Sequence, residues 1–89
     1  SYMEINEETK GWALKNILKF EGTMGWPQGK IRIEAMVEEL ISMSPSIEAG
    51  DWMIKQLLRE CDRCPTPADM RAVMKRRYKP GDELDEINR

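Results

Sequence analysis

The stretch QGKIRIEAMVEELISM, residues 28–43, carries the clearest helical pattern in the chain. Its large apolar residues recur at intervals of three and four, which places them on one face of an α-helix. These residues are Ile33, Met36, Val37, Leu40 and Ile41. Acidic side chains fall on the opposite face, so the stretch predicts an amphipathic helix that buries one side.

Two similar patterns flank this stretch and predict further helices. One begins at Asn6, whose side chain can cap a helix, and runs to about Phe20. Its expected core face is Ala13, Leu14, Ile17 and Leu18. The other begins after a cap at Ser46 and ends near Cys61. Its expected inward residues are Ile47, Gly50, Ile54, Leu57, Leu58 and Cys61.

The sharpest helix start lies at Thr66-Pro67-Ala68-Asp69. Thr66 can cap the helix, Pro67 suits the first helical position, and Asp69 lies near the positive end of the helix dipole. This helix is expected to reach about Tyr78 and to stop before Pro80.

The four segments together predict an all-α fold, a small bundle of about four helices in one domain over residues 1–81. The sequence gives little indication of strands. Its one stretch of alternating apolar and polar residues lies within the predicted helix over residues 28–43. Residues 12–19 and 52–59 match in residue type position by position, so an arrangement as two packed helical hairpins stays open. Residues 82–89 carry a net charge of −3, from four acids against Arg89, and are expected to form a disordered acidic tail.

Length and composition narrow the range of functions. A chain of 89 residues is one small domain, which excludes a large multi-domain enzyme. It contains no stretch apolar enough to cross a bilayer and no signal-peptide pattern, so we expect a cytoplasmic protein. The sequence has no His, which removes the commonest general base and the commonest zinc ligand. We therefore expect no catalytic residues, no cofactor, no bound metal and no small-molecule substrate.

The two cysteines form the motif Cys61-Asp62-Arg63-Cys64, which has the spacing of half a zinc ribbon. A closed zinc site needs four ligands, and this chain supplies two thiols and no imidazole. The end of a helix also disfavours a thiolate, which argues against redox chemistry. We interpret both cysteines as small, partly buried apolar residues that close the third helix.

Two tryptophans are expected to lie opposite the inward faces of their helices, each beside basic residues. Aromatic and cationic groups together on an exposed face are typical of a partner-binding surface, although packing over a loop is an equal alternative. The candidate partner-binding residues are Trp12, Lys15, Lys19, Trp52, Lys55 and Arg59.

The fourth helix and the residues after it are basic. Residues 65–81 contain five cations against Asp69, a net charge of +4. The cations are Arg71, Lys75, Arg76, Arg77 and Lys79. An alternative hypothesis is a helix-turn-helix protein whose fourth helix is the recognition helix that contacts DNA. These cations are its candidate nucleic-acid contacts.

The stretch Cys64-Pro65-Thr66-Pro67-Ala68-Asp69-Met70-Arg71, preceded by a helix with Trp52 near its start, resembles the short replicative-helicase loader proteins of bacteriophages. This resemblance implies a non-enzymatic adaptor of phage or prophage type that acts by protein contact in DNA replication. It implies a replicative helicase or a replication initiator as the partner. A small phage inhibitor of a host or defence protein is a further alternative.

Overall fold

The computed structural model of the protein describes residues 3–24 and 29–76, and the side chains of all of these except residues 21–24. It contains four helices: α1 over Glu7–Met24, α2 over Lys30–Met43, α3 over Ile47–Glu60 and α4 over Pro67–Met74. Within the described ranges there is no strand. The predicted all-α bundle of four helices is confirmed.

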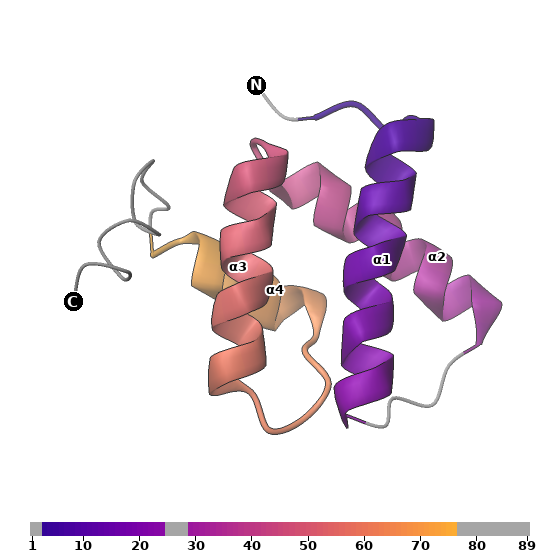
Figure 1. Ribbon diagram of the computed structural model, residues 1–89. Coiled ribbons are helices and arrows are strands. Elements are labelled where there is room, and N and C mark those ends of the chain that lie inside the picture. The colour runs from indigo at the N-terminus through magenta and orange to yellow at the C-terminus, as the bar shows by residue number, and fades with distance from the viewer. Residues whose placement is uncertain (1–2, 25–28, 77–89) are drawn as a thin grey trace.

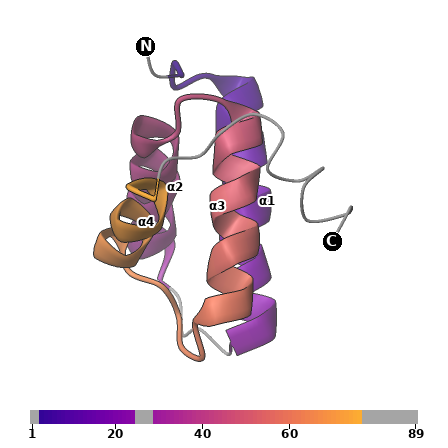
Figure 2. The same cartoon turned by 90° about the vertical axis from the view of Figure 1, so that its left-hand side faces the viewer.

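The helices form two layers, as the two views in Figures 1 and 2 show. Helices α1 and α3 lie side by side in one layer, and α2 and α4 make up the other. Each helix packs against the next member of its hairpin, α1 on α2 and α3 on α4, and the hairpins meet through α2 with α4 and α1 with α3. The chain therefore folds as two packed helical hairpins.

Three helix starts follow the predicted caps. At α1, Asn6 Oδ1 accepts a hydrogen bond from the Thr9 amide at 3.0 Å, and Thr9 Oγ1 accepts one from the Asn6 amide at 2.9 Å. At α3, Ser46 Oγ accepts from the Ala49 amide at 3.1 Å. At α4, Thr66 and Asp69 form a capping box. These bonds satisfy amides that have no partner inside the helix.

Three helix boundaries differ from the prediction. Helix α1 continues beyond Phe20 to Met24, and α2 begins at Lys30, directly after its N-cap Gly29. Gln28, the expected start, lies outside the described residues. Helix α4 ends at Met74, because the Arg76 amide donates to Val73 O in a tighter turn. The expected end at Tyr78 is therefore wrong, and Tyr78 itself lies outside the description.

The core lies between the two layers. From α2 it takes four of the five predicted residues, Met36, Val37, Leu40 and Ile41, and Ile33 packs against it partly buried. Helix α4 adds Met70 and Val73.

The rotation of α1 about its axis differs from the prediction. Ala13 and Ile17 are buried as expected, but Leu14 is 41% exposed and Leu18 is 43% exposed. Asn16 and Phe20 are buried instead. Asn16 can be buried because its Nδ2 donates to Trp12 O at 3.0 Å, so its amide keeps a polar partner.

Helix α3 buries a face that is turned relative to the predicted one. Gly50, Ile54 and Leu57 are buried as expected, whereas Ile47, Leu58 and Cys61 are only partly buried. Its other buried residues are Ala49, Trp52 and Met53. Among the described residues, no helix has both the length and the apolar character needed to cross a membrane.

A candidate partner-binding groove between α1 and α3

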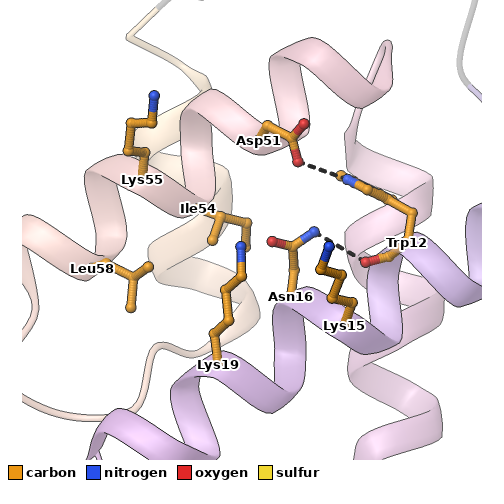
Figure 3. A pocket seen from close by; sticks show the side chains of 8 residues that line it. All are labelled: Trp12, Lys15, Asn16, Lys19, Asp51, Ile54, Lys55 and Leu58. Atoms are coloured by element: carbon orange, nitrogen blue, oxygen red, sulfur yellow. Dashed lines mark hydrogen bonds between the residues drawn. The ribbon is translucent and has the colours of Figure 1, made fainter.

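The two helices of the front layer enclose a groove of about 510 Å³, which Figure 3 shows from close by. Four residues of α1 and four of α3 line it: Trp12, Lys15, Asn16, Lys19, Asp51, Ile54, Lys55 and Leu58. We call this feature the lysine groove. It unites four of the six predicted partner-binding residues, which the sequence had placed on two separate helices.

Trp12 is fixed at one end of the groove by contacts to both helices. Its indole Nε1 donates to Asp51 Oδ1 at 2.7 Å, so the ring bridges α1 to α3. The benzo edge of the ring lies against Gly50, where a β-carbon would stand 2.4 Å from Cζ2 and Cη2. No real β-carbon tolerates that distance, so glycine at position 50 is what allows the ring to lie there.

The charge of the groove is positive. Lys15 and Lys19 rise from α1 toward α3, and Lys55 stands on the opposite wall. Within the described residues neither Lys15 nor Lys19 forms an ion pair. The charged residues of the lining are three lysines and Asp51, and Asp51 accepts the hydrogen bond of Trp12. The groove can therefore accept negative charge from outside the chain.

The lining also contains apolar surface from α3. Leu58 and the indole of Trp12 are partly exposed there, and Ile54 lies beneath them, almost fully buried. Such a site combines a hydrophobic floor with charged edges, the usual arrangement of a protein contact surface. Sequence reasoning missed Asn16, Asp51, Ile54 and Leu58 as groove residues, because only the packing of α1 on α3 brings them beside the lysines.

Trp52 does not belong to the groove. It is 8% exposed and lies in the hydrophobic core, so the prediction that it stands on an exposed aromatic and basic face is wrong. The buried face of α3 is turned from the predicted stripe toward Ala49 and Met53, and this rotation brings Trp52 into the core. Arg59 is exposed but is not among the residues that line the groove.

The basic α4 region is partly neutralised by acids from neighbouring helices. Arg76 Nη2 lies 2.7 Å from Glu60 Oε2 of α3, and Arg71 Nη1 lies 3.6 Å from Glu39 Oε2 of α2. Lys75 is exposed beside them, and Arg77 and Lys79 lie outside the described residues. Two of the three described cations of the predicted DNA-binding set therefore already face carboxylates.

Both cysteines are free thiols, partly buried against the core as interpreted from the sequence. Burial raises the pKa of Cys64 to about 11 and also raises the pKa of Cys61. Within residues 3–24 and 29–76, no group of three or more Cys, Asp or Glu side chains is arranged to hold a metal ion. At neutral pH these thiols are protonated and therefore poor nucleophiles.

Arg63 organises the connection between α3 and α4. Its guanidinium contacts Asp69 through two bonds, Nη1 to Oδ2 at 2.8 Å and Nη2 to Oδ1 at 3.2 Å. These bonds, together with that from the Thr66 amide to Asp69 Oδ2, hold the pKa of Asp69 well below its usual range. The connection is thus tied to the start of α4, a role that the sequence did not reveal for Arg63.

Comparison with protein-family models found no matching family for this chain. Comparisons with curated proteins and with solved structures likewise found no significant match.

Proposed function

We propose that the protein is a non-enzymatic cytoplasmic adaptor that binds an acidic, partly apolar segment of a partner protein in the lysine groove. The observation that carries this proposal is that Lys15, Lys19 and Lys55 line one groove together with apolar residues and Trp12. Acidic side chains of the segment would meet the ammonium groups, and its apolar side chains would cover Leu58 and the indole of Trp12.

The fixed position of Trp12 supports binding by a preformed surface. An aromatic side chain held by a hydrogen bond and by packing loses little conformational entropy on binding, which favours affinity. Tryptophan is also among the residues most enriched at binding hot spots. The ring is engaged with Asp51 and Gly50, so it serves as a wall of the groove.

The identity of the partner remains part of the proposal. The resemblance of residues 64–71 to phage helicase loaders makes a replicative helicase or a replication initiator the first protein to test. A phage inhibitor of a host or defence protein would use the same groove. Direct DNA binding through α4 is less favoured, because Arg71 and Arg76 have acidic neighbours and the chain has a net charge of −2.

A random peptide library displayed against the immobilised protein tests the proposal. We expect the enriched peptides to combine Asp or Glu with large apolar residues. Their binding should be lost in a Lys19→Glu, Lys55→Glu variant, because both ammonium groups line the groove. A matched control, Lys30→Glu with Lys75→Glu, reverses two exposed charges elsewhere and should retain binding.

Two results would contradict the proposal. Enrichment of peptides without acidic residues would show that the lysines do not select the ligand. Retention on random duplex DNA at physiological salt that is lost in an Arg71→Glu, Arg76→Glu variant would favour the helix-turn-helix hypothesis, since phosphate contacts depend steeply on cations and salt.

A further inference from the structure

The side of α1 that faces away from the core carries apolar residues that are exposed to solvent. We call this side the outward face of α1. It consists of Glu7, Gly11, Leu14 and Leu18. Two of its residues are Leu14 and Leu18, which are both exposed although they are large and apolar. The outward face therefore lacks a cover within the described part of the chain.

Gly11 lies in the middle of this face. A glycine inside a helix lowers helix stability relative to alanine, so its presence there calls for a reason. Nothing in the described structure approaches within 4 Å of the place where its β-carbon would be. Gly50 is needed under Trp12, but no intrachain contact requires Gly11. The open position would instead let another helix approach closely.

The outward face has a spacing that fits a copy of itself. Its four positions are separated by four, three and four residues, the repeat of a coiled-coil seam, and this order is the same read in either direction. If a second α1 runs antiparallel to the first, Gly11 of each copy lies opposite Leu14 of the other. Each leucine then fills the space left by a glycine, and the contact occurs twice by symmetry.

The charges beside the seam favour the same orientation. Glu8 and Lys15 are exposed on one flank of the outward face. In the antiparallel arrangement Glu8 of each copy comes beside Lys15 of the other, which gives two equivalent ion pairs. In a parallel arrangement this flank would face the opposite flank of the other copy, so Lys15 would come beside Lys10 and like charges would oppose association.

We propose that two copies of the chain associate through the outward faces of α1, antiparallel, with Leu14 of each copy seated on Gly11 of the other. One helix pair makes a small interface, so we expect a weak dimer with a dissociation constant on the order of micromolar or higher. Lys15 belongs to both sites, but Gly11, Leu14 and Leu18 do not line the lysine groove, so the dimer does not depend on the proposed function.

Sedimentation equilibrium of the full chain over a concentration series tests the dimer. We expect reversible self-association in the wild-type protein and about tenfold or greater weakening in a Gly11→Gln variant, whose side chain occupies the space for Leu14. Ala35→Gln, at an exposed position of α2, is the matched control and should associate like the wild type. Circular dichroism of each variant establishes that it is folded.

A charge exchange tests the orientation. Glu8→Lys alone and Lys15→Glu alone should each weaken association, because each places like charges opposite one another. The double variant should restore it, since the pairs re-form with their signs exchanged. A wild-type protein that stays monomeric throughout, association unaffected by Gly11→Gln, or a double variant weaker than both single variants would overturn the proposal.

Discussion

Arg63 and Asp69 form a bidentate ion pair across the connection between α3 and α4, with nitrogen to oxygen distances of 2.8 and 3.2 Å. The same carboxylate accepts a hydrogen bond from the Thr66 amide at 2.8 Å. One side chain thus holds both the loop and the first turn of the last helix. The position of α4 against α2 and α3 depends on this short segment.

The capping box gives a first prediction. Thr66→Ala removes the oxygen that accepts from the Asp69 amide, and we expect a loss of about 1 kcal/mol in the free energy of unfolding. Urea denaturation measures it. Thr66→Ser keeps the hydroxyl and should restore most of the loss, so an equally large effect from serine would show that the cap is not the cause.

The lowered pKa of Asp69 predicts an acid-dependent stability. Because the folded state favours the ionised carboxylate, its contribution is complete above the ordinary aspartate pKa of about 3.9 and is lost as pH falls below it. We expect Asp69→Asn to be less stable than wild type at neutral pH and to lose less stability on acidification. Thermal unfolding across this pH range measures the effect. Asp62→Asn, at an exposed residue of the same loop, is the control and should follow the wild-type pH profile.

Two glycines should respond oppositely to the same substitution. Gly50→Ala forces a β-carbon against the Trp12 ring, and we expect a destabilisation of about 1–3 kcal/mol. Gly11→Ala meets open space in an exposed helix, so it should stabilise the monomer by about 0.5–1 kcal/mol. Urea unfolding at low protein concentration measures both. Equal effects of the two substitutions would contradict the placement of Trp12.

Neighbouring residues on α1 provide a test of its orientation. Ile17 is almost fully buried and Leu18 is exposed. Ile17→Ala should lower the free energy of unfolding by about 2–5 kcal/mol, because the bundle cannot close the cavity. Leu18→Ala should cost less than about 1 kcal/mol in the monomer. Comparable losses at Leu18 and Ile17 would favour the orientation expected from the sequence, which buries both residues.

The thiols should be slow to react. With its pKa raised to about 11, Cys64 should be alkylated slowly at neutral pH and faster as the solution becomes strongly basic. Mass spectrometry after timed iodoacetamide treatment follows each cysteine separately. A chelator should leave the helical circular dichroism unchanged, because two thiols without any His are too few ligands for a structural zinc. Rapid alkylation of Cys64 at neutral pH would contradict its burial.

Local signals predicted the parts of the fold that local interactions determine. The cap at Thr66 and the apolar face of α2 each depend on residues a few positions apart, so the sequence contains the whole interaction. The face of α1 depends on its neighbours instead. Hydrophobicity predicted Leu14 and Leu18 as core residues, whereas the packing of the helices buries Asn16. The side-chain amide of Asn16 donates a hydrogen bond to Trp12 O.

The candidate site was predicted in pieces. Trp12 with Lys15 and Lys19 on one helix, and Lys55 on another, were identified as basic and aromatic surface. The sequence could not show that α1 and α3 lie in one layer and enclose a groove. It also placed Trp52 outside, because the packing of the neighbouring helices, and not the periodicity of α3, determines which of its sides is buried.

The contact between Trp12 and Gly50 joins one hairpin to the other. The residue allowed at position 50 therefore depends on the residue at position 12. As long as position 12 holds tryptophan, selection should keep position 50 as glycine, because no other residue leaves room for the ring. If a relative has a smaller residue at position 12, position 50 becomes free to accept alanine and gain helix propensity. The two positions should therefore covary among homologues, together with the carboxylate at position 51 that receives the indole hydrogen bond.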